Sequence, residues 1–567
     1  MKRILLLIFA AIIVAAAAAV TVVWLNTPLC SDRATEQRAP IEDMFAIYVD
    51  IEQLVEKGAI ENFITPEYRR MIATMASANI ENPEEAAYLE SVVNDLSQLG
   101  LNLSQPAYVY GNYSGEEIGS VVVIVEVADV AKLDRFFNTF IEEGNPNAVI
   151  TRNGDNRVIM GLDSTAIMGY NSTRLAVVIS QVSAGELQTL TADALARPLS
   201  DLSIFGSRDV AAYIDIAQAL DVAEALIEAE KQREEDYAYE YAYDYEVEGY
   251  NATIAEYDAM LEQIAAMREL YADNATIIAG LTFDEGRATI DVTTDGFDTS
   301  IYTDNYARTS NANLQYVEDS AIAVVNMGIK GVNLSEYLNE NMPANLADML
   351  DMSEMAPTEF NVMMAVVLDM IETINGDVMI ALNDIGLGSG SAALTVDAVA
   401  TFDVTDNYIY SMATQFGTAM LHPAGENLYT FRFAPFTGYF GQQENTLFAS
   451  LGSPLTVAAN PATNCDWYQD VAGSYSYIVV DIENLMQNEL VSMTYSMMLA
   501  GQNSDMELIN NFVELSDYVY LKLAEPNRTE LTVVLKNREV NALQQIIEQL
   551  VAGLELPINP AVGNDSI

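Results

Sequence analysis

The sequence has few of the residues that form disulfide frameworks or histidine-based sites. Among 567 residues it contains two cysteines, Cys30 and Cys465, and one histidine, His422. Two cysteines cannot form a disulfide framework, and whether they bridge each other depends on a geometry that the sequence does not give. A zinc site of histidine and cysteine ligands is excluded because too few of these residues exist.

Basic residues are also scarce, and lysine most of all. The chain has 82 acidic and 25 basic residues, which gives a net charge of −57. The electrostatic field of so large a negative charge repels nucleic acid phosphates and anionic lipid head groups, so we expect no nucleic acid partner. The acidic surface fits colloidal repulsion that keeps an exported protein dispersed, and it also fits a salty or calcium-rich habitat.

Sequence motifs of known catalytic classes are missing as well. No Ser-x-x-Lys, Gly-x-Ser-x-Gly or Walker sequence occurs, and no Asp-x-Asp-x-Asp-Gly calcium loop. His422 precedes Pro423 in a loop-like stretch and is interpreted as a surface residue. Gly386-Leu-Gly-Ser-Gly390 lacks a following helix and lysine, so we interpret it as a hairpin turn and not as a phosphate site. We therefore assign no catalytic, cofactor or metal residues.

Carboxylates remain the one source of acid-base chemistry. Asp50, Asp215 and Asp481 each follow an apolar run, and Asn326 stands at the corresponding place of a fourth run. These residues suit the caps of following helices, where a side-chain oxygen accepts from free backbone N–H groups. Two carboxylates at a suitable separation would also suffice for glycoside hydrolysis, so an acid-based hydrolase acting on glycans stays as the alternative function.

An apolar segment stands at the N-terminus. Ile4 to Leu25 is uncharged and long enough to cross a bilayer as a helix, and two basic residues precede it. An uncleaved anchor, a signal peptide cleaved after residues 17–19, and a lipoprotein acylated at Cys30 are three alternatives. Each makes 1–25 the membrane anchor or signal segment and 26–40 a linker. Each also places the bulk of the chain outside the cytoplasm, in the periplasm or at the cell surface.

Most of the remaining chain is built from one repeated pattern. In Ala46 to Gly58 a continuous apolar run ends at an acid, and a short helical segment then closes at a glycine. A run without polar alternation is typical of a strand covered on both faces. Close echoes recur at 210–220, 321–328 and 477–485.

The order of these patterns indicates an α+β protein with two duplicated halves. Each half is expected to hold two strand-helix-hairpin modules, with antiparallel sheets covered by helices. We place the first half at 41–312, with a helical and Tyr-acidic insertion at 217–273, the second half at 313–556, and a flexible tail at 557–567.

The Tyr-acidic segment alternates aromatic and acidic residues between two helical stretches. Its aromatic members are Tyr237, Tyr239, Tyr241, Tyr243 and Tyr245. Its charge favours exposure to solvent. The segment is either a lengthened linker between two helices or an interaction segment presented to a partner or to cations.

Several of these stretches also resemble a known group of proteins. The N-terminal anchor, Ala46 to Gly58, Gly100 to Tyr110, and the hairpin and helix of Val121 to Phe140 look like an uncharacterised bacterial domain-of-unknown-function family. The resemblance implies an exported, membrane-anchored protein of the cell envelope, often a lipoprotein. Its motifs are structural, so it carries over no active residues. The chain departs from the family in having Pro28 and Leu29 before Cys30, where lipidation sites have small residues.

These observations favour a non-catalytic envelope protein, either a scaffold or a binding protein. We expect it to contact the membrane through its N-terminal segment. The sheet, or a cleft, would receive an envelope protein, a peptide or a glycan.

Overall fold

The computed structural model describes residues 43–553 except for short internal stretches. These stretches are 61–68, 71–73, 75–81, 115–116, 145–148, 161–165, 181–183, 198–201, 241–246, 271–273, 298, 341–356, 388–393, 419, 434–435 and 500–503. The predicted anchor 1–25, the linker 26–40 with Cys30, and the tail 557–567 lie outside the described residues. No helix within the described part of the chain is both long enough and apolar enough to span a bilayer.

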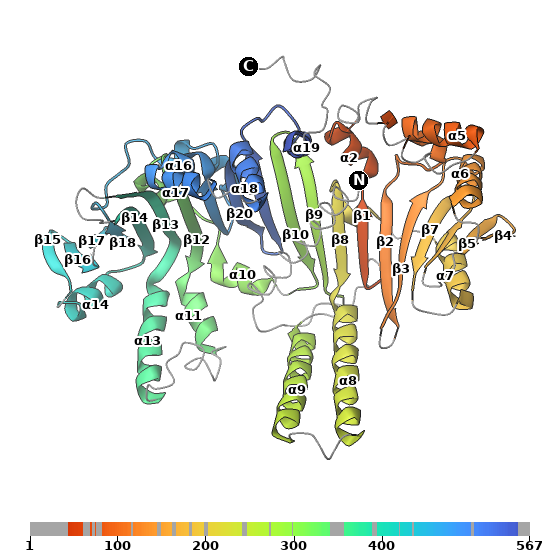
Figure 1. Cartoon of the computed structure of the whole chain (residues 1–567). Coiled ribbons are helices and arrows are strands. Elements are labelled where there is room, and N and C mark those ends of the chain that lie inside the picture. The colour runs from red at the N-terminus through yellow and green to blue at the C-terminus, as the bar shows by residue number, and fades with distance from the viewer. Residues whose placement is uncertain are drawn as a thin grey trace. The chain divides into compact units, whose positions relative to one another are not determined.

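The chain is an α+β protein with extensive antiparallel sheet, and it divides into two compact units (Figure 1). Unit 1 comprises residues 1–297 and 539–567, and unit 2 comprises residues 298–538. The sequence patterns had placed this division at 312/313 and kept 539–556 in the second half. The C-terminal helix α19 (Ala542–Gly553) belongs with unit 1 because it packs on α2, β9 and β10, and Asn541 Nδ2 donates to Phe283 O at 3.0 Å.

Unit 1 contains an antiparallel sheet in the order β4-β5-β6-β7-β3-β2-β1-β8-β9-β10. Its strands are β1 (Phe45–Val49), β2 (Ala107–Ser114), β3 (Glu117–Glu126), β4 (Val149–Asn153), β5 (Asn156–Met160), β6 (Ala166–Tyr170), β7 (Arg174–Ile179), β8 (Val210–Asp215), β9 (Thr276–Asp284) and β10 (Arg287–Asp295). Its other helices are α2 (Ile51–Lys57), α5 (Pro83–Asn94), η1 (Leu96–Leu99), α6 (Val130–Gly144), α7 (Ala184–Ala196), η2 (Leu202–Phe205), α8 (Ile216–Glu240) and α9 (Val247–Leu270).

Local sequence explains where these elements begin and end. Asn82 caps α5 and Pro83 opens it, because proline lacks the N–H that would be unpaired there. Gly100 ends η1 at a φ of +78°, a conformation that other residues rarely adopt. A Cβ at this position would lie 2.2 Å from Asp129 O, so a side chain cannot replace the hydrogen atom there.

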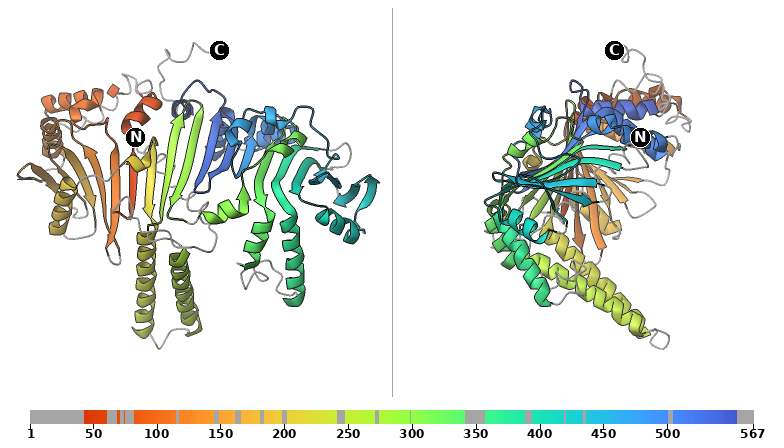
Figure 2. Two further views of the ribbon diagram at one scale, coloured as in Figure 1. Left: turned by 180° about the vertical axis from the view of Figure 1, so that it is seen from behind. Right: turned by 90° about the vertical axis from the view of Figure 1, so that its left-hand side faces the viewer.

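The core of unit 1 lies on one face of its sheet. Tyr108, Ile124, Val178 and Tyr213 are buried there, and α7 contributes the buried side chain of Leu187. Helices α8 and α9 pair with each other and project from the ends of the strands as a helical hairpin (Figures 1 and 2). Their presence confirms the two helices that the sequence predicts within the insertion, at 217–231 and 252–271, although α8 extends to Glu240 and α9 begins at Val247.

Unit 2 contains an antiparallel sheet in the order β15-β16-β17-β18-β14-β13-β12-β19-β20-β21, and the short β11 pairs with β12 as well. Its strands are β11 (Tyr306–Ala307), β12 (Ala323–Lys330), β13 (Ile374–Leu387), β14 (Leu394–Val404), β15 (His422–Gly425), β16 (Leu428–Phe433), β17 (Phe436–Gln443), β18 (Thr446–Leu451), β19 (Ser476–Asp481), β20 (Ser516–Glu525) and β21 (Arg528–Leu535). Its helices are α10 (Ser300–Asn305), η3 (Ala312–Tyr316), α11 (Gly331–Glu340), α13 (Pro357–Thr373), α14 (Tyr408–Phe416), η4 (Ala462–Asn464), α15 (Tyr468–Val471), α16 (Ile482–Gln487), α17 (Glu489–Leu499) and α18 (Ser504–Leu515).

The core of unit 2 also lies on one face of the sheet. Val324, Met379, Val479 and Tyr520 come from four neighbouring strands, and all are buried. Trp467, Leu314 and other residues from η3, η4, α15 and their connecting loops cover them. Figure 1 shows the longer helices of unit 2 at the ends of the strands, with α16, α17 and α18 at one end and α11 and α13 at the other.

The opposite face of the unit 2 sheet is not closed over in the same way. Val325 and Ile478 lie within the apolar runs that the sequence pattern assigned to strands covered on both faces. Their side chains are 36% and 43% exposed. The expectation of two-sided cover is therefore wrong at these positions, because no helix in the described part of unit 2 buries them.

Candidate functional site

The carboxylates that follow the repeated strands serve as helix caps. Asp50 Oδ1 accepts from Gln53 N at 3.0 Å, Asp215 Oδ1 from Gln218 N at 3.0 Å, and Asp481 Oδ1 from Asn484 N at 2.8 Å. Each side chain thereby satisfies a backbone N–H that has no partner within its helix. The three aspartates lie at the starts of different helices, and within unit 1 Asp50 and Asp215 stand at opposite ends of the paired strands β1 and β8.

Asn326 does not share this role, and the interpretation of it as a cap was wrong. β12 continues beyond it to Lys330, and α11 begins at Gly331. Asn326 is instead fully buried inside the strand, and its amide Nδ2 donates to Asn311 Oδ1 at 3.1 Å. Its own Oδ1 is buried and has no partner among the described protein atoms.

Asp377 is the centre of the polar cluster around Asn326. Its carboxylate accepts from Ser310 N at 2.9 Å and from Asn311 N at 2.7 Å, and Tyr477 Oη donates to Asn311 Oδ1 at 2.7 Å. Burial raises the pKa of Tyr477 above its usual value. The cluster fastens the turn at Asn311, where φ is +60°, onto β12 and β13. This is a structural role, because the carboxylate is fully buried and already paired.

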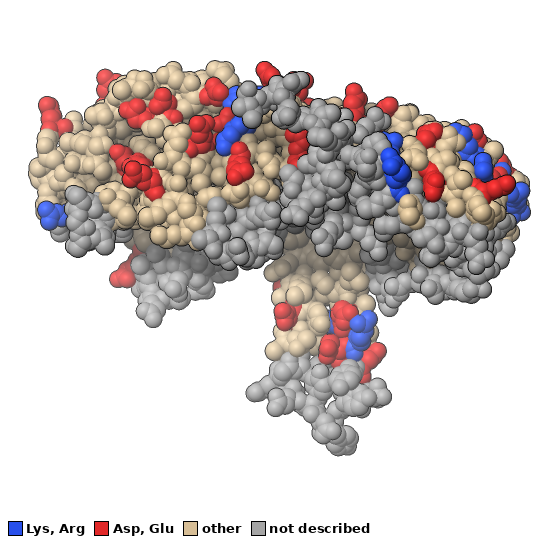
Figure 3. All heavy atoms as spheres, turned by 45° about the horizontal axis from the view of Figure 1, so that its top comes forward, with Lys and Arg blue, Asp and Glu red and all other residues tan. Residues whose placement is uncertain are grey.

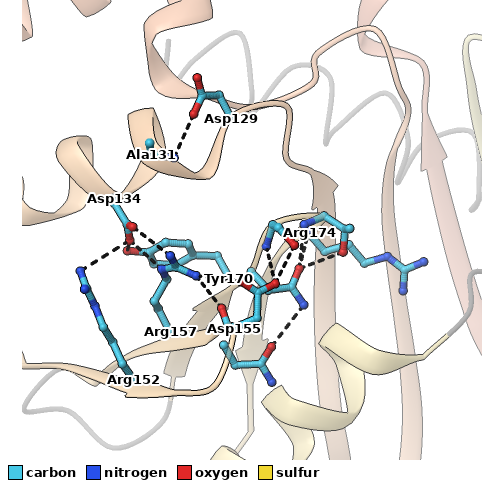
Figure 4. A network of polar contacts seen from close by, with 12 residues as sticks. Asp129, Ala131, Asp134, Arg152, Asp155, Arg157, Tyr170 and Arg174 are labelled. Atoms are coloured by element: carbon cyan, nitrogen blue, oxygen red, sulfur yellow. Dashed lines mark hydrogen bonds and ion pairs between the residues drawn. The ribbon is translucent and has the colours of Figure 1, made fainter.

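A second polar cluster joins α6 to β5 and β6 in unit 1 (Figure 4). Arg157 donates to both oxygens of Asp134, from Nε at 2.8 Å and from Nη2 at 3.0 Å, and Tyr170 Oη donates to Asp134 Oδ1 at 2.9 Å. The hydrogen bond with Asp134 raises the pKa of Arg157, and burial raises that of Tyr170. The two-point contact fixes the geometry of both partners, so this cluster is an ion pair that orients α6.

Asp481 is the described carboxylate whose pKa rises most clearly. Burial raises the pKa of Asp481 to about 6, and the nearby carboxylates of Asp517 and Glu483 act in the same direction. A raised pKa is one property of a general acid. Its Oδ1 is, however, engaged as the cap of α16, and a structural cap explains the residue without chemistry.

The remaining residues that the sequence singled out show no reactive arrangement. Burial raises the pKa of Cys465 to about 12, which keeps its thiol protonated. His422 is exposed on β15. Gly386 and Leu387 lie on β13, which pairs with β14 as a hairpin, and residues 388–390 of the glycine-rich stretch are outside the described residues. Within the described residues, no three His, Cys, Asp or Glu side chains could hold a metal ion.

The Tyr-acidic segment is only partly described. Tyr237 and Tyr239 belong to α8, but their side chains lie outside the described part, as do Tyr241, Tyr243 and Tyr245. The helices on either side of the segment are joined by ion pairs, including Lys231 with Asp258 at 2.6 Å. The described part of the insertion is thus a helical hairpin.

The feature of unit 2 that suits binding is the uncovered face of its sheet. Ile380, Val325 and Ile478 lie side by side in register on β13, β12 and β19, and their side chains are 53%, 36% and 43% exposed. Paired residues in a sheet point to the same face, so the three form one continuous row. Ala400, Leu521 and Leu531 extend it across β14, β20 and β21.

Two further rows flank this one on the same face. They consist of Ala398, Leu382, Ala323, Val480, Val519 and Val533 on one side, and of Phe402, Val378, Met327, Ser476, Leu523 and Thr529 on the other. We call the three rows the open face. None of these residues is charged, and none is buried. With strands ~4.8 Å apart and rows ~7 Å apart, the three rows occupy roughly 500 Å² of sheet, in which Ile380, Val325 and Ile478 are exposed and the other side chains are half-buried.

Charged residues are unevenly distributed over the part of the surface that the structure describes. Figure 3 shows acidic residues spread over the described surface, whereas lysine and arginine gather in a few places. Lys522 of β20 and Glu530 of β21 are register partners on the covered side of the sheet, where they form an ion pair at 3.0 Å. The sequence analysis did not single out any residue of the open face. The sequence feature that corresponds to the open face is the set of apolar runs without polar alternation. These runs were interpreted as strands covered on both faces.

Comparisons with known proteins give a family and little else. No curated protein matches the chain. Among solved structures, crystal forms IV and I of TP0453 match with TM-scores of 0.21 and 0.20 and 9% identity; both matches cover 46% of this chain, and 81% and 80% of the respective TP0453 chains. These scores are too low to indicate a shared fold. The family model described as domain of unknown function DUF4836 matches residues 37–543. The chain therefore belongs to the DUF4836 family.

Proposed function

We propose that the protein is a non-catalytic binding protein of the bacterial cell envelope, and that the open face of unit 2 receives its ligand. One observation supports this most. The strands carry apolar residues on both faces, as strands with two covered faces do, and the chain itself covers one face. A sheet with this composition is complete only when something apolar lies on the second face.

The energy available at this face is large enough for binding. At ~25 cal/mol per Å², covering half of the roughly 500 Å² would favour a complex by about 6 kcal/mol before the entropic cost of association. Single exposed apolar residues are normal on proteins, but a continuous uncharged patch on a chain of charge −57 is a recognised sign of an interaction site.

The proposal includes an internal duplication. The strand order β4-β5-β6-β7-β3-β2-β1-β8-β9-β10 in unit 1 matches, place for place, the order β15-β16-β17-β18-β14-β13-β12-β19-β20-β21 in unit 2. The helix after β1 and the helix after β12 also occupy equivalent positions in the order of elements. This agreement supports two copies of one ancestral half.

The two copies differ on the face that matters for binding. Ile47, Val109 and Val123 of unit 1 form one row on β1, β2 and β3, the strands that take the places of β12, β13 and β14 in the strand order. Further along that row, Ala279 and Val292 are buried, and Ile216 and Phe297 pack against their cluster. Unit 1 thus closes part of its second face with its own residues, so we assign binding to unit 2.

The cellular location belongs to the same proposal. The charged and then apolar N-terminal segment, residues 1–25, supports export with an anchor, a cleaved signal or acylation at Cys30. Fractionation of cells that express the full chain tests this part. Recovery with the membrane, and digestion by protease added to opened envelopes, is expected; recovery in the cytosol would contradict it.

Binding at the open face is tested by a charged substitution at its centre. Val325→Glu should reduce the binding of the neutral apolar dye Nile red to the full-length protein at least tenfold, because a carboxylate in an apolar site loses its hydration. Val362→Glu is the matched control, since Val362 is 67% exposed on α13, outside the open face. Equal dye binding by native protein and both variants would overturn the proposed site.

A further inference from the structure

We infer that the ligand of the open face is the acyl chain of a membrane lipid with a zwitterionic or neutral head group. This inference rests on the proposed function and specifies its ligand class. It follows from three properties of the face: its hydrogen-bonding capacity, its charge and the shape of its side chains.

Hydrogen-bonding groups are almost missing from the open face. Among its side chains only Ser476 and Thr529 carry a hydroxyl, and both lie in one outer row. The backbone groups of β14, β13, β12, β19 and β20 pair with a strand on each side. A glycan or an extended peptide laid across this face would give up hydrogen bonds to water without replacing them, which disfavours binding. A hydrocarbon chain gives up none.

Charge restricts the ligand further. The open face has no basic residue that could pair with a phosphate or carboxylate, and the whole chain has a charge of −57. This field repels an anionic head group held near the face. The same field opposes a second copy of the chain, whose face-to-face contact of roughly 1,000 Å² in total would also be small for a stable dimer. A lipid whose head group has no net charge is not repelled by this field.

The side chains of the face are aliphatic. Ile380, Val325 and Ile478 at its centre are β-branched, and Phe402 in an outer row is the one aromatic residue among the three rows. Sugar-binding sites commonly present aromatic rings to the apolar side of the ring, and the middle of this face offers none. A surface of aliphatic side chains suits an extended methylene chain, which needs apolar contact and no hydrogen-bonding partner.

The test uses full-length protein and a series of lysophosphatidylcholines with octanoyl, lauroyl and palmitoyl chains. Their head group is constant and zwitterionic, so the series varies only the chain. Displacement of Nile red reports binding. If the chain lies on the apolar face, each added methylene should tighten binding by up to about fourfold. Val325→Glu should weaken the binding of the palmitoyl lipid at least tenfold, and Val362→Glu should leave its binding unchanged.

A second variant guards against misfolding. Ile478 is the neighbour of Val325 in the same row, and Ile478→Gln makes this position polar without adding a charge. This variant should weaken the binding of the palmitoyl lipid severalfold. Circular dichroism and the thermal midpoint of each variant should match those of the native protein. Loss of binding together with loss of fold at Val325→Glu, while folded Ile478→Gln binds like native protein, would contradict the inference.

Other ligands separate the inference from the proposed function. A leucine-rich helical peptide and solubilised peptidoglycan fragments are tested in the same displacement assay. If the peptide or the fragments displace the dye in a manner that depends on Val325 and the lipids do not, the lipid inference fails and the binding function stands. If no ligand depends on Val325 or Ile478, both fail.

Discussion

Ile380 and Val325 are direct cross-strand partners on β13 and β12, and both side chains remain 36% or more exposed. Their sequence neighbours Met379 and Val324 point to the other face of the same strands and are buried. One residue step along either strand therefore separates the core of unit 2 from the open face.

This alternation predicts unequal costs for two adjacent substitutions. Met379→Ala should lower the free energy of unfolding of unit 2 by about 2–5 kcal/mol, because it leaves a cavity in a closed core. Ile380→Ala should change it by less than about 1 kcal/mol in the ligand-free protein, since its side chain already meets solvent. Urea unfolding followed by hydrogen exchange in β12 and β13 measures both. Equal costs would mean that something covers Ile380 in solution.

Asp481 should make stability depend on pH between about 4 and 6. Burial raises its folded-state pKa from 3.8 to about 6, so over this range the folded protein binds the proton more tightly than the unfolded protein. The free energy of unfolding therefore falls as the pH rises from about 4 to about 6 and stays lower above it. Asp481→Asn keeps a capping side chain and removes the charge, so it should raise stability at pH 7 by about 1–2 kcal/mol.

The gain from Asp481→Asn should shrink toward pH 4, where the native carboxyl is protonated. Thermal unfolding across this pH range measures it. Asp50→Asn, the same change at the cap of α2, controls for the loss of a capping carboxylate. A variant without added stability at neutral pH would show that water reaches the Asp481 carboxylate. A measured loss of glycan hydrolysis in Asp481→Asn would instead favour the alternative of an acid-based hydrolase.

The ion pair of Asp134 with Arg157 should matter for unit 1. Asp134→Ala leaves Arg157 and the buried Tyr170 without their shared acceptor, and it should cost about 2–3 kcal/mol. Hydrogen exchange in α6, β5 and β6 should rise more than in unit 2. Asp155→Ala is the control, because Asp155 is exposed and contacts Arg157 Nη1 at a longer 3.3 Å. An Asp155 variant as destabilised as the Asp134 variant would contradict the role of the two-point contact.

Cys465 should be inert in the folded protein. Burial raises the pKa of its thiol to about 12, so the reactive thiolate is rare at neutral pH. In Cys30→Ser protein, where Cys465 is the remaining cysteine, iodoacetamide should label slowly in buffer and rapidly in concentrated urea. Mass spectrometry follows the label. Rapid labelling of folded protein would show that Cys465 is accessible and ionised.

Local patterns were enough to predict many elements. The capping positions of Asp50, Asp215 and Asp481 and the hairpin of β13 and β14 all depend on residues close together in the sequence. Asn326 was misassigned because the apolar run gives no sign of where β12 ends, and the strand continues to Lys330. Where such a strand ends depends on its pairing with strands that are distant in the sequence.

The open face could not be predicted for a related reason. Ile380 and Ile478 are about a hundred residues apart, and Val325 brings them into one row because β12 pairs with both β13 and β19. An apolar run shows that both faces of a strand avoid charge. Whether helices of the same chain cover the second face depends on where α11, α13 and α16 pack. These helices lie at the ends of the strands (Figure 1).

Crosslinking inside the cell tests the binding function most directly. A photoreactive benzoylphenylalanine is placed at position 325 or, as control, at position 362 of the full-length protein, and the adducts are identified by mass spectrometry after illumination. We predict adducts that contain lipid acyl chains at position 325 and not at position 362. No adduct at position 325, or the same adducts at both positions, would contradict binding at the open face.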